Sequence, residues 1–402
     1  MIETWSPDWS NAVFSVAERE RRWAKVRELM SRDGVDAMVC LPCSNSHNRG
    51  AADALYLTQL GENSDETTVY FPIEGEPTAW LSRGGVWPSS NWFTDIRAAS
   101  RGTGGRAIVD RLKEAGLTDG RIAIAGLTGG VLAHCREAEG EANWQSVEAI
   151  RAALPGAEIL SGTDLLGEAR YVKSDEEIEF LRKGTQLAEK VLNTVKQHAR
   201  IGVRERHVFA QMMYTSAREG GSFTPMFGWI SGPAGNPYHR VEQPSFRKFE
   251  AGDILAVEFD GRWGGYIAQI DQTFTFGPAG QDTMDSMELT LEAFQRVLER
   301  MKPGVTAGEL MEAARITGLN GRAVVNLGMH GRGTGDDGPL ITPNVTPQAM
   351  RAEMLEGAVM CVKPGATLDG KPYGANFGET VVVTRDGGVR LGKRPLELCE
   401  LT

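Results

Sequence analysis

Two aspartates in "VEFDGRWGGYIAQIDQTF", residues 257–274, have types and spacing that could bind a metal ion. Asp260 and Asp271 stand eleven residues apart across a glycine-rich turn. Two strands of a β-hairpin would bring them together, and carboxylate oxygens are the ligands that hard divalent cations prefer. The question is whether these aspartates or other residues of the hairpin form the functional site.

The chain before this hairpin predicts a compact α/β domain that ends near residue 165. Ser15 and Glu18 predict the start of a helix that ends at Gly34. Strands are predicted at "VDAMVCL", "TTVYFPI", "PTAWLS" and "RIAIAG", and the helical pattern "AIVDRLKEAG" separates the last two. Alternating helices and strands of this kind are typical of an α/β fold.

A second domain is predicted from a helix that begins after Ser174, with Glu177 completing a capping box. An irregular segment "FGWISGPAGNPYHR" precedes the hairpin. The chain then continues with a helix through "MELTLEAFQRVLERM", a shorter helix after Thr306, a glycine-rich loop around His330, and strands at "AVMCVKP" and "ETVVVT". Helices beside an antiparallel sheet predict an α+β domain.

Composition limits the classes of partner. A net charge of -10 and a pI near 5.3 argue against nucleic acid or an anionic membrane. No apolar run reaches membrane-spanning length, and the first ten residues lack the pattern of a signal peptide, so we expect a cytoplasmic protein. Of the five cysteines, only Cys40 and Cys43 have a suggestive spacing, and a strand end with buried thiols is favoured over a redox or metal pair.

Five segments of the chain together resemble the pita-bread superfamily, which includes methionine aminopeptidase, aminopeptidase P, prolidase and creatinase. They occur in the family's order and at similar spacing across residues 170–390: "ARYVKSDEEIEFLRKG", "EAGDILAVEFDGRWGGYIAQIDQTFTF", "MKPGVTAGEL", "MHGRG" and "EGAVMCVKPG". The preceding part resembles the creatinase-type domain of prolidase and creatinase. The resemblance implies an α/β amino-terminal creatinase-like domain, residues 1–165, and an α+β pita-bread catalytic domain, residues 166–402.

The resemblance also implies where metal ligands would lie. Peptidases of the family hold two metal ions with two aspartates, one histidine and two glutamates. Aligning the hairpin on its Gly-Tyr and Thr-Phe pairs, residues 265–266 and 273–274, moves the inherited ligands two residues back from the aspartates. The five ligand positions are then occupied by Glu258, Gln269, His330, Lys363 and Gly378.

This set of residues is poor in metal-binding oxygens. One carboxylate, one amide and one imidazole supply few anionic ligands, and a protonated lysine repels a cation. We therefore expect no metal cofactor, and an ion pair between Lys363 and Glu258 in its place. Glu379 adjoins Gly378, but one step along a strand points to the other face.

Asp260 and Asp271 remain candidates for a shifted metal site. Along each strand they share a face with Glu258 and Gln269, displaced by about 7 Å. If no metal is bound, the resemblance places Asp260, Gln269 and Asp271 where they could contact a substrate.

Creatinase, which the chain resembles, hydrolyses a C–N bond of a small polar molecule without metal and uses a histidine as a proton shuttle. By this resemblance Glu258 is the candidate nucleophile or base, and His239 lies near the place of the shuttle histidine. His330 could be a shuttle or an oxyanion donor, and Lys363 a polarising cation. Each of these residues also has a structural interpretation: a surface loop for His239, a loop role for His330, and a structural ion pair for Glu258 with Lys363.

Other residues near the motifs are candidate substrate contacts. Asp337 stands where the family has a second histidine, and with Asp336 it could bind a cationic group or form a solvated turn. Trp263, together with Trp87, Trp92 and Trp229, could form an aromatic wall for a cationic or planar substrate, although most tryptophans are core residues. Glu379 is the last candidate substrate contact.

The predicted function is a metal-independent hydrolase that cleaves a C–N bond of a small polar amide, amidine or cyclic osmolyte-like substrate. Three alternatives stay open: a metal-dependent Xaa-Pro peptidase, a lyase of the dimethylsulfoniopropionate-cleaving type, and a non-catalytic binding protein on the same fold. The resemblance further implies a homodimer in which the amino-terminal domain of one subunit covers the site of its partner.

Overall fold

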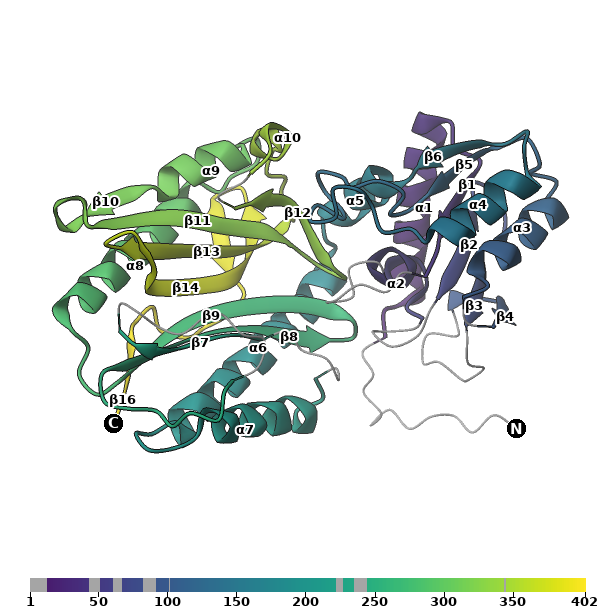
Figure 1. The fold of residues 1–402 in the computed structure, drawn as a ribbon. Helices are drawn as coiled ribbons and strands as arrows, with labels where there is room; N and C mark the ends of the chain where they lie inside the picture. Colours follow the sequence, from purple (N-terminus) through teal and green to yellow (C-terminus); the bar gives the residue numbers. More distant parts are fainter. Residues whose placement is uncertain are drawn as a thin grey trace. The chain divides into compact units, whose positions relative to one another are not determined.

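The computed structural model describes residues 13–42, 51–60, 67–81, 92–100, 102–221, 227–234, 244–342 and 345–402. The chain divides into two compact units (Figure 1). The amino-terminal unit consists of Met1–Tyr171 and the short segment Thr334–Gly338, and the carboxy-terminal unit consists of Val172–Gly333 and Pro339–Thr402. Each unit has its own sheet and its own helices.

The described part of the amino-terminal unit has a six-stranded sheet in the order β4-β3-β2-β1-β5-β6. β1 pairs antiparallel with β2 and parallel with β5, so the sheet is mixed. Its strands are β1 (Ala37–Cys40), β2 (Thr68–Pro72), β3 (Thr78–Leu81), β4 (Asp95–Ala98), β5 (Arg121–Ile124) and β6 (Glu158–Ser161). The four predicted strands are present as β1, β2, β3 and β5, whereas β4 and β6 were not predicted.

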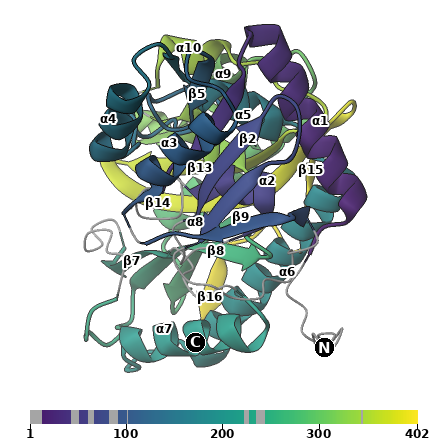
Figure 2. The same cartoon turned by 90° about the vertical axis from the view of Figure 1, so that its right-hand side faces the viewer.

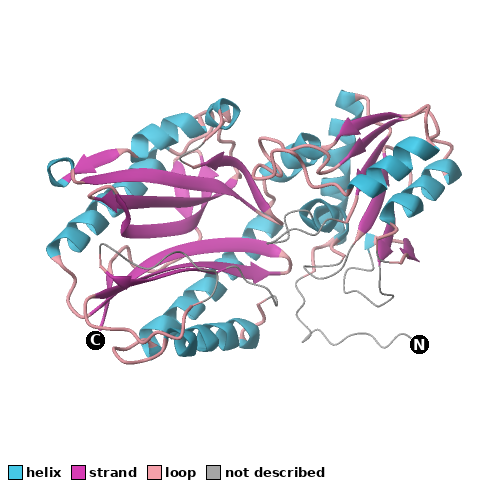
Figure 3. Cartoon of the chain, in the orientation of Figure 1, coloured by secondary structure: helices cyan, strands magenta, loops and turns pink. Residues whose placement is uncertain are grey.

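Helices pack around this sheet, as Figure 3 shows by its separate colours for helices and strands. They are α1 (Val16–Asp33), α2 (Ala51–Thr58), α3 (Gly104–Glu114), α4 (Trp144–Ala153) and α5 (Thr163–Tyr171). α1 begins where predicted, because the Ser15 side chain accepts a hydrogen bond from the Glu18 backbone N–H, and ends at Gly34 with φ 65°. The Glu18 carboxylate binds Arg21 and Arg22.

The described part of the carboxy-terminal unit is built on a ten-stranded, strongly curved sheet. Its main path is β10-β11-β13-β14-β9-β8-β7, and β12, β15 and β16 pair with β11, β14 and β9. The strands are β7 (Phe227–Pro233), β8 (Asp253–Trp263), β9 (Tyr266–Phe276), β10 (Ile316–Gly318), β11 (Ala323–Arg332), β12 (Asp336–Ile341), β13 (Val359–Leu368), β14 (Lys371–Thr384), β15 (Gly387–Arg390) and β16 (Cys399–Leu401).

Two sets of helices cover the two halves of this sheet. α6 (Asp175–His198) and α7 (Glu205–Arg218) lie against the half made of β7, β8 and β9, while α8 (Gln281–Arg300) and α9 (Ala307–Ala314) lie against β11, β13 and β14 (Figures 1 and 2). α10 (Pro347–Arg351) is a single short turn. α6 begins with the complete capping box predicted at Ser174 and Glu177.

The β8–β9 hairpin has one face in the core and one face available for chemistry. Leu255, Val257 and Phe259 pack in a core cluster with residues of α6 and α7. Because strand side chains alternate, Glu258 and Asp260 point to the opposite face. Strand alternation had predicted that Glu258 and Asp260 share a face.

Two expectations for this unit were wrong. The predicted glycine-rich loop around His330 is strand β11, whose residue Gly328 pairs with Lys363 of β13. A side chain at Gly328 would begin 3.2 Å from the Lys363 carbonyl oxygen, so glycine suits this close strand contact. In the predicted irregular segment, the residues "FGWISGP" form strand β7 instead. β7 is the last strand in the sheet order of the described residues, so the missing backbone N–H of Pro233 leaves no neighbouring strand without a hydrogen bond.

No helix in the described part of the chain is both long and apolar enough to cross a membrane.

Candidate functional site

Three neighbouring strands of the carboxy-terminal unit place the sequence-predicted residues in one row. Glu258 on β8 lies opposite Asp271 on β9, and Asp271 lies opposite Gly378 on β14. Asp260 lies opposite Gln269 two pairs further along the hairpin. The register thus puts both candidate pairs on the same face, as strand alternation predicted.

A chain of polar contacts connects four of these residues. The amide Nε2 of Gln269 donates to Glu258 Oε1 at 2.7 Å, and Gln269 Oε1 lies 3.0 Å from His330 Nε2. The ammonium of Lys363 lies 3.5 Å from Glu258 Oε1. We call Glu258, Gln269, Asp271, His330 and Lys363 the Lys363 cluster. The aligned positions therefore meet in space, with Lys363 next to Glu258.

The orientation of the Gln269 amide constrains the protons of its neighbours. An ionised carboxylate only accepts, so the Gln269 N–H must point to Glu258 and its oxygen to His330. His330 then has an acceptor at each ring nitrogen, because Nδ1 lies 3.2 Å from the Gly331 carbonyl oxygen. Nε2 carries the proton that it donates to Gln269 Oε1 in this arrangement. A flipped amide would instead require a protonated Glu258 and an unprotonated Nε2.

Lys363 favours the ionised form of Glu258. Burial by itself lowers the pKa of the Lys363 ammonium, but the negative charges of Glu258 and Asp271 raise this pKa above its ordinary value. The ammonium is therefore charged at neutral pH. A positive charge 3.5 Å from Glu258 stabilises the carboxylate, and hence the amide orientation in which Gln269 donates to it.

Gly378 belongs to the same arrangement because it leaves room for two side chains. A Cβ at position 378 would lie 2.8 Å from Cγ of Lys363 and 3.0 Å from Cγ of Asp271. Lys363 and Asp271 thus occupy the space beside β14 into which a larger residue at position 378 would project. A larger residue at position 378 would therefore collide with the side chain of Lys363.

Asp260 is held by arginines. Arg332 Nη2 donates to Asp260 Oδ1 at 3.1 Å, and Arg262 Nη2 lies 3.6 Å from Asp260 Oδ2. All three side chains are buried, with at most 3% of each exposed. Neither arginine was singled out from the sequence, although the Arg332 in "MHGRG" stands two residues after His330 and hence on the same strand face.

The residues at the aligned ligand positions do not fit a pair of metal ions. Gly378 has no ligand atom, Gln269 points its N–H toward Glu258, and the Lys363 ammonium occupies the space next to that carboxylate. Asp260 and Asp271, the alternative pair, lie near arginine and lysine cations. In the part of the chain that the structure describes, no three His, Cys, Asp or Glu side chains converge as metal ligands.

Several predicted residues lie away from the Lys363 cluster. Glu379 faces the other side of β14, where it is fully buried and paired with Arg390 and Arg394 at 2.5 and 2.9 Å. The indole of Trp263 lies at the tip of the hairpin with the Lys183 ammonium 5.8 Å above its ring. His239 lies outside the described residues.

The other tryptophans and the cysteine pair are only partly described. Trp92 and Trp229 are fully buried, one in each unit. Cys40 is buried at the end of β1, whereas Trp87 and Cys43 lie outside the described residues.

Asp337 belongs to a second cluster of charges, in the amino-terminal unit. Arg170 pairs at 2.7 Å with Asp53 and at 2.7 Å with Asp337, and His134 Nε2 lies 2.8 Å from Asp53. Glu141 pairs with His134 Nδ1. Asp53, His134, Glu141, Arg170 and Asp337 are here called the Arg170 cluster. Burial opposes the charged imidazole, but Asp53 and Glu141 raise the pKa of His134 to about 10.

Comparison with known proteins gives one family. A model described as metallopeptidase family M24 matches residues 179–385. An Xaa-Pro dipeptidase of Pyrococcus furiosus is 29% identical over 65% of this chain and 74% of its own length. A putative dipeptidase, YkvY, of Bacillus subtilis is 30% identical over 62% of this chain and 68% of its own. The crystal structure of an X-Pro aminopeptidase from Thermotoga maritima superposes with a TM-score of 0.73 at 20% identity, covering 94% of this chain and 99% of that one.

Proposed function

Because this chain belongs to metallopeptidase family M24, we propose that it is a hydrolase of that family which cleaves a C–N bond without the family's pair of metal ions. The observation that carries the proposal is the Lys363 ammonium, 3.5 Å from Glu258 Oε1. The Lys363 ammonium thus lies next to the Glu258 carboxylate, where a metal ion would bind in the family's peptidases, and Gly378 leaves room for the lysine side chain. The proposed substrate is a small polar amide, amidine or cyclic osmolyte-like molecule.

The names of the relatives favour a second candidate, a metal-dependent Xaa-Pro peptidase. A dinuclear site needs several anionic oxygen ligands around each ion. The donors available here are Glu258, whose Oε1 is engaged by an amide and an ammonium, and two aspartates beside cations. The side chains of the site support the metal-independent hydrolase, whereas the sequence similarity supports the peptidase.

Glu258 is proposed as the group that starts the reaction. Its side chain is 14% exposed, so it is buried but reachable. It either attacks the scissile carbon or removes a proton from an attacking water. Lys363 stabilises the negative charge that develops on the substrate oxygen or nitrogen as the new bond forms.

Gln269 and His330 are proposed to act through Glu258. The Gln269 amide holds the carboxylate in position, and the two hydrogen bonds of His330 fix the direction of that amide. His239 remains the predicted proton shuttle to the leaving nitrogen. We propose substrate contacts for Asp271 and Trp263, and a substrate role for Asp260, Glu379 and Asp337 remains a prediction that their arginine pairs do not support.

The deciding experiment measures metal content and activity on the same purified protein. Metal per chain is measured by elemental mass spectrometry, and hydrolysis is assayed on a panel of Xaa-Pro dipeptides and small amides, amidines and cyclic amides. We expect far less than one metal per chain, and a turnover that changes less than twofold with chelator. Two bound metals with chelator-sensitive Xaa-Pro cleavage would establish the peptidase instead.

A variant with the family's carboxylates restored is the matched control. The triple change Gln269→Asp, Lys363→Glu and Gly378→Glu places acidic side chains at three of the five aligned positions and keeps Glu258 and His330. We expect this variant to bind more divalent metal per chain than the natural protein.

Product analysis separates the remaining alternatives. A lyase releases an unsaturated product without incorporating solvent oxygen, whereas a hydrolase incorporates one oxygen atom from labelled water. A non-catalytic protein would bind members of the panel without converting them. The predicted homodimer is tested separately by light scattering.

A further inference from the structure

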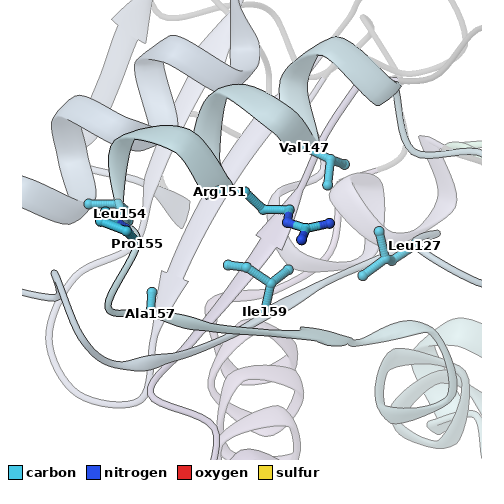
Figure 4. A pocket seen from close by; sticks show the side chains of 7 residues that line it. All are labelled: Leu127, Val147, Arg151, Leu154, Pro155, Ala157 and Ile159. Carbon is cyan, nitrogen blue, oxygen red and sulfur yellow. The ribbon is translucent and has the colours of Figure 1, made fainter.

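A pocket of about 430 Å³ lies in the amino-terminal unit, between α4 and the edge strand β6 (Figure 4). Its volume falls in the range of small-molecule sites. Six of its seven lining residues have apolar side chains and the seventh is an arginine: Leu127, Val147, Arg151, Leu154, Pro155, Ala157 and Ile159.

The pocket exists because the core of this unit is open at that edge. Val147 and Leu154 belong to the buried core cluster, and Leu127, Ala157 and Ile159 are only partly buried against it. β6 is the last strand in the sheet order of the described residues. The partly buried side chains of Leu127, Ala157 and Ile159 therefore remain accessible from the cavity.

Arg151 is the polar group of the pocket. Its side chain extends from α4 beside the pocket and is 61% exposed, so its guanidinium lies open to solvent at the pocket mouth (Figure 4). Within the described residues its ion pair is with Glu148 at 3.6 Å, which is longer than a hydrogen bond. A guanidinium has five N–H donors in a fork that matches a carboxylate, so donors remain available to a ligand in the pocket.

We propose that this pocket binds a small amphipathic monocarboxylate, with its apolar body against Leu127, Ala157 and Ile159 and its carboxylate on Arg151. Burial of the alkyl or aryl body adds to the affinity, and the guanidinium selects the anion over a neutral molecule of the same shape. This site is separate from the Lys363 cluster, and the inference does not depend on the proposed function.

The test uses the full chain and three probes of equal chain length: octanoate, octanol and octylamine. Isothermal titration calorimetry should show octanoate binding at least tenfold more tightly than octanol, and octylamine more weakly than both. Arg151→Met should bring the affinity for octanoate down to that for octanol, while the matched variant Arg106→Met, an exposed arginine on α3, should keep the preference. Ala157→Phe, which fills the pocket, should abolish binding of both octanoate and octanol.

Two results would overturn the proposal. One is equal binding of octanoate and octanol by the natural chain, or an undiminished octanoate preference in Arg151→Met. The other is a groove covered by a second copy of the chain: octanoate would then not bind, and Ala157→Phe would change the mass found by light scattering.

Discussion

The two charged clusters, one in each unit, differ in how closely their charges are paired. In the Arg170 cluster, arginine and histidine contact carboxylates at 2.7–2.8 Å, and the side chains of Asp53, His134 and Arg170 are 1–3% exposed. In the Lys363 cluster the ammonium is 3.5 Å from the carboxylate, and both side chains are 14–15% exposed. An amide also stands between the carboxylate and the histidine.

This difference separates a structural arrangement from one suited to chemistry. Side chains that are only 1–3% exposed give a substrate almost no access to the charges of the Arg170 cluster. The longer Lys363 contact leaves ammonium N–H groups that a substrate can use, and partial exposure gives it access. We therefore expect changes in the Arg170 cluster to alter stability and changes in the Lys363 cluster to alter activity.

The largest effect is expected for Glu258→Gln. Loss of the proposed nucleophile or base should reduce kcat by roughly 1,000-fold, with thermal unfolding little changed. The measurement is kcat on the best substrate of the panel, with Glu299→Gln, an exposed glutamate on α8, as the control. Full activity of Glu258→Gln would remove Glu258 from the mechanism.

Arg170→Met should have the largest effect on stability. It leaves Asp53 and Asp337 buried without their common cation, which should lower the free energy of unfolding by about 3–5 kcal/mol. Urea unfolding measures this loss. The double variant Arg170→Met with Asp337→Asn should recover part of it, since one buried charge is removed; no recovery would show that Asp337 is not stabilised by Arg170.

Lys363→Met should reduce activity more than stability. We expect kcat to fall about 100-fold, because the cation that stabilises developing negative charge is lost, while stability falls by only about 1–3 kcal/mol. Kinetics and urea unfolding on the same preparation test this split. If Lys363→Met lost as much stability as Arg170→Met and kept its kcat, the two clusters would both be structural.

The smallest predicted effect is a pH dependence of thermal stability that arises from His134 in the amino-terminal unit. The pKa of His134 is raised from 6.5 to about 10, so its stabilisation is fully present below pH 6.5 and is lost as pH rises toward 10. The melting temperature should therefore fall by roughly 5 °C between pH 7 and pH 10. His134→Gln should be less stable at pH 7 and lack most of this decline.

Much of the candidate site follows from short-range sequence patterns. The alignment of the hairpin on Gly265-Tyr266 and Thr273-Phe274 led to Glu258 and Gln269, and the structure joins these two by a hydrogen bond. The predicted pairing of Lys363 with Glu258 is present. Strand alternation correctly put Glu379 on the other face, because a period of two depends only on local backbone geometry.

Other features could not be predicted because they depend on contacts between distant segments. The strand that carries His330 has glycines typical of a loop, and only its pairing with β13 makes it a strand. Arg332 and Arg262 neutralise Asp260 from two strands. Asp337, seven residues after His330, lies in the other unit because Arg170 binds it there.

The sequence by itself determined the family's fold, the face of the hairpin that carries the polar residues, and the loss of carboxylates at three aligned ligand positions, since periodicity and residue identity are properties of the chain. Only the tertiary structure decided what replaced them. The Lys363 ammonium reaches Glu258, and Gly378 makes room for Lys363 and Asp271, because three strands bring these atoms within contact distance.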